Sequence, residues 1–195
     1  MSREVWKPGN MLYPVPAIMV TVGDEEVNNI ITIAWTGTVN SDPAMVSISV
    51  RKSRYSHELL MKNREFVINL VTKKLARAMD YCGVKSGRDV DKFKEMRLTR
   101  GKAVKVNAPI IEESPVNIEC VVKQVISLGS HDMFLAEVLA VDVDDSYMDE
   151  SGRFNLEKAN LVAYSHGQYY TLGENIGKFG FSVKKKVKNK IKKHR

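Results

Sequence analysis

Short apolar stretches rich in Val, Ile and Thr recur along the chain, and turn-forming residues separate them. Residues 45–50 read Met-Val-Ser-Ile-Ser-Val, the two-residue alternation that is typical of a half-buried strand. Gly-Ser-His-Asp at 129–132 separates two longer apolar stretches, which predicts a long hairpin. Strands are predicted at 17–22, 28–35, 45–50, 65–70, 117–127, 133–145 and 160–164, the first two also paired as a hairpin.

In two places the spacing of the apolar residues changes from that of a strand to that of a helix. Within residues 53–63, two leucines follow a polar start, which predicts a short helix that leads into the next strand. Further along, Leu75, Met79 and Cys82 are spaced for one helix face, and Gly83 is the expected stop.

The order of these elements favours a mainly β (α+β) fold. Six or seven strands at hairpin spacing with two or three helices fit a Greek-key-like or split β-barrel better than alternating βαβ layers. The stretch 86–101 is polar and charged around a single Phe, so it predicts a loop or a short helix rather than core. With 195 residues, 44% hydrophobic content and no repeat or linker, we expect one domain over 1–182, followed by a tail at 183–195.

The net charge of +7 suggests nucleic-acid binding until the charge is located. Residues 183–195 hold eight of the 30 Lys and Arg residues and no acidic residue. The rest of the chain, with 22 basic against 23 acidic residues, is nearly neutral. We therefore expect a solvated, disordered basic tail that binds polyanions only weakly, and no specific nucleic-acid partner.

Several common sites are missing from the sequence. There is no G-x-G-x-x-G, no phosphate-binding P-loop, no G-x-S-x-G elbow and no His or Cys spacing that indicates zinc, so no metal is expected. No apolar run is long enough to span a bilayer, and the start of the chain lacks the apolar core of a signal peptide. Cys82 and Cys120 are expected to be buried free thiols in a reducing cytoplasm.

Two segments carry polar groups that a plain barrel does not need. Residues 28–37 end in small polar residues and Gly37, where backbone N–H groups could approach a flat ligand closely. Residues 47–56 place hydroxyls and three cations at a strand end that leads into a helix start. Hydroxyl groups, guanidinium groups and free helical N–H groups together suit a phosphate dianion.

These segments belong to a longer series of motifs. In chain order the series is Pro14-Val15-Pro16-Ala17, Asn29 with Ala34-Trp35-Thr36-Gly37, Arg51-Lys52-Ser53-Arg54-Tyr55-Ser56, Glu65-Phe66-Val67-Ile68-Asn69-Leu70, Ser86-Gly87 with Asp91-Lys92-Phe93, and Tyr164 with Gly167-Gln168-Tyr169-Tyr170. Their order and spacing resemble the flavin reductase-like family, in particular its flavoredoxin branch. The resemblance implies non-covalently bound FMN in a split barrel, and a homodimer in which the partner helps to wall the site.

The resemblance also implies roles for individual residues. Residues 32–37 would lie along the isoalloxazine ring, other hydroxyl and cationic groups would hold the phosphate and ribityl chain, and Ser56 stands where the family often has Thr. Lys92 would reach the flavin, and His131 and Tyr164 would contact the ring edge. The implied cofactor-binding residues are Asn29, Thr32, Ala34, Trp35, Thr36, Gly37, Ser49, Arg51, Ser53, Ser56, Lys92, His131 and Tyr164.

Each of these residues also has a simpler interpretation that involves no ligand. Trp35 is equally suited to core packing, and Arg51 could belong to a solvated helix start. Lys92 could pair with a neighbouring aspartate on the surface, and His131 could be an exposed turn residue. The functional interpretation gains weight because several polar groups would converge on one ligand.

The resemblance implies an oxidoreductase in which FMN carries the chemistry. Electrons would pass from NADH or NADPH through FMN to free flavin, ferric iron or a protein partner, with His131 and Lys92 tuning the flavin rather than acting as catalytic acid or base. One alternative is an FMN electron-transfer protein that another protein reduces. A second is a flavin-free binding module that uses the basic tail. A cytoplasmic protein without a membrane partner is expected.

Overall fold

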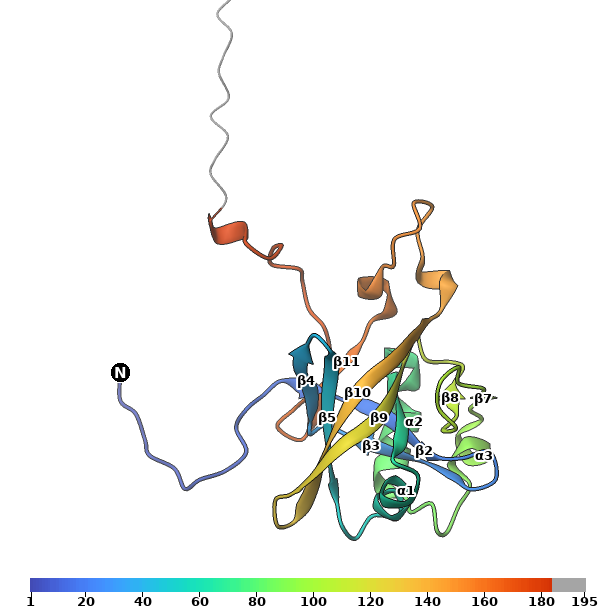
Figure 1. The fold of residues 1–195 in the computed structure, drawn as a ribbon. Helices are drawn as coiled ribbons and strands as arrows, with labels where there is room; N and C mark the ends of the chain where they lie inside the picture. Colours follow the sequence, from blue (N-terminus) through green and yellow to red (C-terminus); the bar gives the residue numbers. More distant parts are fainter. Residues whose placement is uncertain (184–195) are drawn as a thin grey trace, which may run out of the picture.

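The computed structural model describes residues 1–183, and its main layer is a curled sheet of seven antiparallel strands (Figure 1). The order across the sheet is β3-β2-β6-β9-β10-β5-β4, so β3 and β4 form its two edges. These edges are joined in sequence but not paired, which makes the sheet a split, unclosed barrel. The strands are β2 (Ile18–Gly23), β3 (Asn28–Ile33), β4 (Thr36–Ser41), β5 (Ala44–Arg51), β6 (Glu65–Leu70), β9 (Val116–Ser127) and β10 (His131–Val143).

The barrel interior is filled by every second residue of the strands. In β2, for example, Ile18, Val20 and Val22 point inward and are almost completely buried. The helix α1 (Tyr55–Asn63) closes one end of the barrel, because Leu60 joins the same buried cluster.

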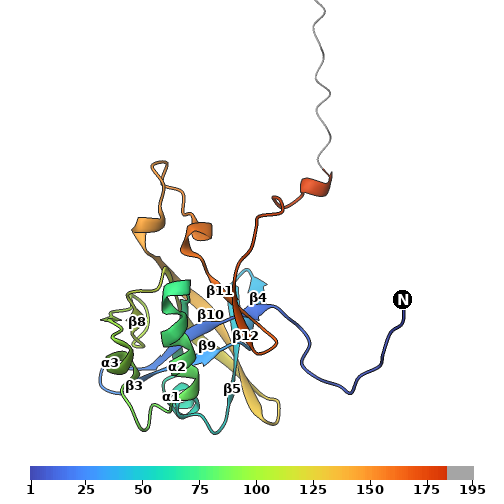
Figure 2. The same cartoon turned by 180° about the vertical axis from the view of Figure 1, so that it is seen from behind.

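A second apolar cluster lies on the outer face of β2 and β3. The helices α2 (Ala76–Val84) and α3 (Lys92–Met96) cover this face, as Figure 2 shows from behind. Met19 and Ile30 of the strands pack there against Met79 and Phe93 of the helices. Both faces of β2 are therefore buried, which explains its nearly continuous apolar sequence.

A small three-stranded sheet and several short elements complete the described chain. The small sheet has the order β1-β11-β12. Its strands are β1 (Val15–Pro16), β11 (Val162–Ser165) and β12 (Gln168–Thr171). The remaining elements are β7 (Arg100–Gly101), β8 (Ile110–Ile111) and the 3₁₀ turns Lys73–Leu75, Asp145–Tyr147, Leu156–Ala159 and Phe181–Val183.

The structure departs from the sequence predictions in several places, among them the short strands β1, β7 and β8, which were not predicted. β4 and β12 were not predicted, because both are exposed strands without an apolar alternation. Gly83 does not stop α2 but lies inside it, where a Cβ would come within 3.1 Å of the Thr32 Cβ. The polar stretch 86–101 also contributes to the core, since Phe93 is 1% exposed.

Other predictions are confirmed or lie beyond the described residues. The predicted strand 65–70 and the long hairpin β9–β10 are present, and Cys82 and Cys120 are buried free thiols. Residues 184–195, which make up nearly all of the predicted tail, lie outside the described part of the chain. Among residues 1–183, no helix is long and apolar enough to cross a membrane.

Candidate functional site

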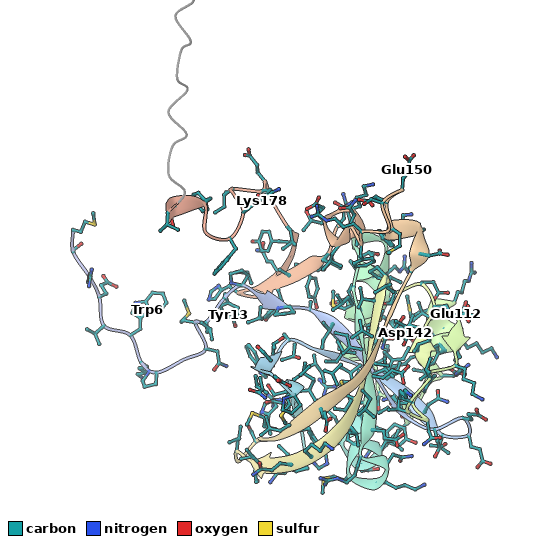
Figure 3. The ribbon with its side chains drawn as sticks, turned by 45° about the horizontal axis from the view of Figure 1, so that its top comes forward. Trp6, Tyr13, Glu112, Asp142, Glu150 and Lys178 are labelled. Carbon is teal, nitrogen blue, oxygen red and sulfur yellow. The ribbon has the colours of Figure 1, made fainter. Side chains whose placement is uncertain are left out.

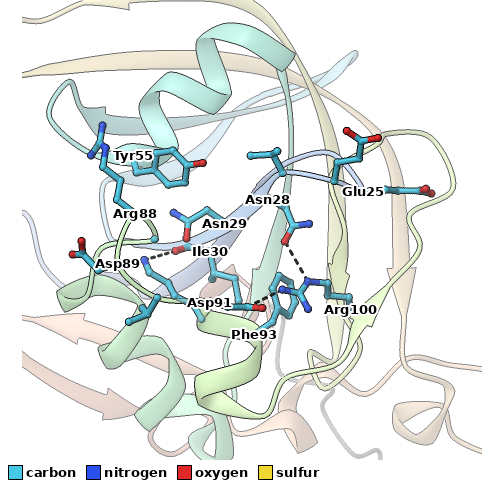
Figure 4. Close-up of a pocket in the computed structure, with 15 residues that line it drawn as sticks. Glu25, Asn28, Asn29, Ile30, Tyr55, Arg88, Asp89, Asp91, Phe93 and Arg100 are labelled. Atoms are coloured by element: carbon cyan, nitrogen blue, oxygen red, sulfur yellow. Dashed lines mark hydrogen bonds and ion pairs between the residues drawn. The ribbon is translucent and has the colours of Figure 1, made fainter.

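Three of the cavities along β3 and around Ala34 and Trp35, the two residues that join β3 to β4, form the candidate site. A further cavity of about 550 Å³ at the start of β3 is lined by the carboxylates of Glu25, Glu26, Asp89 and Asp91 and is drawn in Figure 4. β3 is an edge of the sheet, so on one side its backbone N–H and C=O groups have no neighbouring strand within residues 1–183. Such an edge can offer hydrogen bonds to a flat heterocycle. We name the three spaces the cationic cavity, the N-terminal cavity and the tyrosine cavity.

The cationic cavity has a volume of about 400 Å³ and lies between β3, the start of α1 and the end of α2. Its lining contains five cations and no carboxylate. α1 begins at Tyr55 without a side-chain cap, so free N–H groups of its first turn add to the positive potential. Its lining residues are Asn29, Ile31, Arg51, Ser53, Arg54, Tyr55, Ser56, Cys82, Lys85, Ser86, Gly87, Arg88 and Lys92.

One hydrogen bond connects two of these lining residues across the cavity wall. The amide Nδ2 of Asn29 donates to the Oγ of Ser56 over 2.8 Å. Both residues line the cavity and are buried, Asn29 being 5% and Ser56 0% exposed.

Lys92 lies in the wall of the cationic cavity, but its ammonium group is held by the protein itself. The Nζ donates to the backbone carbonyls of Ile30 over 2.6 Å and Cys82 over 2.8 Å. Burial lowers the pKa of Lys92 to about 8. The surface ion pair considered from the sequence is absent within residues 1–183, because Asp91 pairs with Arg100 instead.

The N-terminal cavity has a volume of about 500 Å³ and is mainly apolar. His131 is the first residue of β10, lies opposite Arg51 of β5, and interacts through Nδ1 with the Ser130 hydroxyl over 2.9 Å. Burial, and then the nearby Arg51 guanidinium, lower the pKa of His131. The cavity is lined by Gly9, Asn10, Met11, Leu12, Val15, Ala34, Trp35, Thr36, Ser49, Leu128 and His131.

The tyrosine cavity, of about 230 Å³, lies between the end of β3, α2 and the β11–β12 hairpin. The Tyr169 hydroxyl donates to Asp80 Oδ1 over 3.0 Å, which fixes the hairpin to α2. Tyr13 connects this cavity with the N-terminal cavity, because its ring centroid lies 5.7 Å from Tyr164 and 6.3 Å from Trp35. The cavity is lined by Ala17, Thr32, Ala34, Asp80, Gly83, Val84, Tyr164 and Tyr169.

Most residues singled out from the sequence line one of these cavities. The cationic cavity contains Asn29, Arg51, Ser53, Ser56 and Lys92. The tyrosine cavity contains Thr32, Ala34 and Tyr164, and the N-terminal cavity contains Ala34, Trp35, Thr36, Ser49 and His131. Gly37 lines none of the three: it pairs with Ser47 in β4 and has open space around its Cα.

Sequence reasoning missed several lining residues. Lys85 and Arg88 flank the Ser86-Gly87 motif, so a basic pair around a Ser-Gly turn was a usable signal. No comparable signal marks Met11 and Leu12, whose place follows only from the path of the N-terminal segment.

The three cavities offer the kinds of group that a phosphate and a flat ring need, as in a flavin mononucleotide. The cationic cavity supplies cations, hydroxyls and helical N–H groups for a phosphate. The other two supply an unpaired strand edge, aromatic rings and apolar walls for a flat ring. Within residues 1–183, no cluster of His, Cys, Asp or Glu side chains is arranged to hold a metal ion.

A split barrel with this site defines a class of flavin-binding oxidoreductase folds. Residues 10–173 match the flavin reductase like domain, and the chain therefore belongs to that family.

Individual relatives agree with this assignment. An uncharacterised protein, PYRAB12460 of Pyrococcus abyssi, is 31% identical over 85% of this chain and 95% of its own length. The structure of flavoredoxin from Desulfovibrio vulgaris superimposes with a TM-score of 0.86 at 28% identity, covering 94% of this chain and all of that one. An FMN-binding protein from Thermus thermophilus superimposes with a TM-score of 0.75 at 27% identity, over 91% of this chain and 99% of that one.

Proposed function

We propose that this protein is an FMN-dependent oxidoreductase that takes electrons from NADH or NADPH and passes them to a small-molecule or protein acceptor. The observation that carries the proposal is the cationic cavity. It is lined by five cations and by no carboxylate, so it suits a phosphate dianion, and it borders the edge strand β3. Family membership and the likeness to flavoredoxin and to an FMN-binding protein support the same cofactor.

In this proposal the residues of the chain bind and orient the cofactor. Arg51 and Arg54 attract the phosphate, and Ser53 lies between them on the turn before α1. When bound, FMN supplies the hydride and electron chemistry. Burial lowers the pKa of His131, which favours its neutral form, and because Nδ1 interacts with Ser130, Nε2 is the ring nitrogen that can meet a ligand at the N-terminal cavity.

The binding part of the proposal is tested with FMN and riboflavin, which differ only in the phosphate. Arg51→Gln should weaken FMN binding roughly tenfold or more, the usual size of a charge-assisted hydrogen bond, and should leave riboflavin binding nearly unchanged. Arg77→Gln is the matched control, because Arg77 is exposed on α2 and lines none of the three cavities. Flavin fluorescence quenching measures both affinities. Equal losses for both flavins would place the phosphate elsewhere.

The electron donor is tested by rapid mixing of the FMN-loaded protein with NADH and with NADPH. Bleaching of the flavin absorbance by either nucleotide is the expected result. No bleaching with either would favour an electron-transfer protein that another protein reduces. A chain that binds no flavin at all would refute the proposed function.

We further propose that two copies associate. The N-terminal segment runs away from the barrel, with Trp6 71% and Leu12 87% exposed (Figure 3). Near the other end of the described chain, Ile176 is 87% and Phe179 107% exposed. Exposed apolar side chains on two extended segments favour a surface that a second copy covers. Light scattering should give the mass of a dimer, and Leu12→Ser with Phe179→Ser should shift it toward the monomer. A monomeric wild-type protein would refute the association.

A further inference from the structure

Residues 51–54 connect β5 to α1, and we name them the β5–α1 turn. All four residues are exposed, and α1 begins after Arg54 without a side-chain cap. Within the turn, the backbone N–H of Arg54 donates to the carbonyl of Arg51 over 3.0 Å. Burial does not hold the turn against the barrel, so its position depends on the contacts that it and the following helix make with other elements.

One buried carboxylate contacts both the β5–α1 turn and the helix that follows it. Asp132, the second residue of β10, is 7% exposed. Its Oδ2 lies 2.8 Å from Nε2 of His57, and its Oδ1 lies 3.3 Å from Nζ of Lys52. An ionised carboxylate only accepts hydrogen bonds, so Nε2 of His57 carries the hydrogen and is the donor. This hydrogen bond is also the main cause that holds the pKa of Asp132 below its usual range.

The barrel holds Asp132 and its two partners in place. β10 lies between β9 and β5 in the sheet, so backbone pairing fixes Asp132 on both sides. The ring of His57 meets the ring of Phe134 edge to face with 5.6 Å between the centroids, and Phe134 is fully buried. Nζ of Lys52 also donates to the Ser127 hydroxyl over 2.9 Å. Asp132 therefore ties an exposed turn and the first turn of α1 to the rigid part of the fold.

The three partners lie behind the candidate site. Asp132, His57 and Lys52 line neither the cationic cavity nor the other two cavities. Through its charge alone, a carboxylate attached to a phosphate-binding turn would repel the phosphate dianion. A favourable effect of Asp132 on phosphate binding would have to act through the position of the turn. Charge and position thus predict effects of opposite sign.

We propose that Asp132 and His57 are positioning residues that hold the β5–α1 turn in the shape that binds the phosphate of FMN. This inference rests on the proposed function, because it takes the phosphate as the ligand of the cationic cavity. It concerns residues that touch no ligand, and it connects the phosphate end of the site to the tip of the β9–β10 hairpin.

The test compares three flavins: FMN, riboflavin, which lacks the phosphate, and lumiflavin, which lacks the whole ribityl chain. Asp132→Ala and His57→Phe should each weaken FMN about three- to tenfold, the size of one hydrogen bond, and should change the other two affinities little. His57→Phe keeps the ring that packs on Phe134 and removes only the donor. Lumiflavin also reports whether a change at position 132 disturbs the neighbouring His131 at the ring end. Flavin fluorescence quenching measures all three affinities.

Asp132→Asn separates the charge from the hydrogen bond. It removes the same charge as Asp132→Ala but keeps an oxygen that can accept from His57, so it should recover part of the lost FMN affinity. Charge alone predicts that both variants bind FMN more tightly than the wild type. Glu137→Gln is the matched control, because it breaks the 2.6 Å ion pair with Lys123 on the same hairpin, away from the three cavities, and should leave FMN binding unchanged.

A double variant tests whether the two residues act as one unit. Asp132→Ala/His57→Phe should bind FMN no more weakly than the weaker of the two single variants. Urea unfolding of each variant measures its stability alongside. A merely structural role would lower the affinities for all three flavins together with the stability.

Four results would overturn the inference. Unchanged or tighter FMN binding by Asp132→Ala would leave only the charge effect, and equal losses for the three flavins would indicate a general distortion. A loss in Asp132→Asn as large as in Asp132→Ala would deny a role to the hydrogen bond, and additive losses in the double variant would show independent action. If Asp132→Ala does not fold, His57→Phe decides. A wild-type chain that binds none of the flavins would instead refute the proposed function itself.

Discussion

Lys92 makes the stability of the protein depend on pH in a direction that can be worked out from its surroundings. The side chain is 4% exposed, and its ammonium group has two backbone carbonyls as partners. Burial lowers its pKa from 10.5 to about 8, although the neighbouring Cys82 opposes this shift. A difference of this size corresponds to roughly 3 kcal/mol between the charged states of the folded and unfolded chains.

The sign follows from proton binding. Above pH 8 the folded chain releases the Lys92 proton, while the unfolded chain keeps it until about pH 10.5. Because the unfolded state then binds more protons, stability rises with pH in this window. The contribution of Lys92 to the free energy of unfolding should increase by about 2 kcal/mol between about pH 7 and 9.5.

The assay is urea unfolding of the wild-type protein and Lys92→Met at several pH values in that range. The difference between their unfolding free energies should grow with pH in favour of the wild type. The buried thiols Cys82 and Cys120, with pKa values raised by burial to about 11 and about 12, act in the opposite direction. They are present in both proteins, so their effect largely cancels in the difference. Lys74→Met is the control, because Lys74 is exposed and its surroundings change little on folding.

Two outcomes would refute this reasoning. Parallel curves for the wild type and Lys92→Met would mean that the buried ammonium is not the titrating group. A difference that shrinks with rising pH would reverse the sign and imply that the charged form is favoured by folding. Saturating FMN should flatten the wild-type curve, since a phosphate in the cationic cavity favours the charged lysine.

Three further predictions test other parts of the structure. Arg51→Gln should raise the pKa of His131, because one of the two causes that lower it is removed; an unchanged NMR titration would contradict this. Glu119→Gln should lower the free energy of unfolding by about 1–3 kcal/mol in a urea titration, since the buried carboxylate accepts three backbone N–H groups at residues 104–106. Although burial alone raises the pKa of Glu119, these N–H groups lower it, so the deficit should disappear as the pH falls through the acidic range. Ala34→Leu should weaken lumiflavin as strongly as FMN, because Ala34 borders both ring-sized cavities; a loss limited to FMN would place the ring elsewhere.

The strands that could be predicted from the sequence are those that bury apolar residues. The 65–70 strand has four consecutive buried residues, with Phe66 and Ile68 in the barrel interior and Val67 in a separate apolar cluster. β10 alternates buried and partly buried residues over its first half. β12 reads Gln-Tyr-Tyr-Thr and is exposed along its whole length, so its hydrogen bonds to β11 leave no apolar pattern. Exposed edge strands depend on backbone pairing, which the sequence does not record.

The candidate site follows the same division. Hydroxyls and cations near the start of α1 were predictable, because residue types suited to a phosphate gather in one short segment. The partners of Lys92 were not, since they are backbone carbonyls 62 and 10 residues away and any residue can provide one. A pattern of side chains cannot indicate which carbonyl a lysine will reach.

The stretch 32–37 was expected to lie as one segment along the isoalloxazine ring, but its residues line two different cavities. Thr32 lines the tyrosine cavity, whereas Trp35 and Thr36 line the N-terminal cavity, because the chain bends at Ala34 and Trp35 between β3 and β4. Ala34, with the smallest side chain among these four, borders both. Ala34 is therefore the residue at which a larger side chain would narrow both cavities at once.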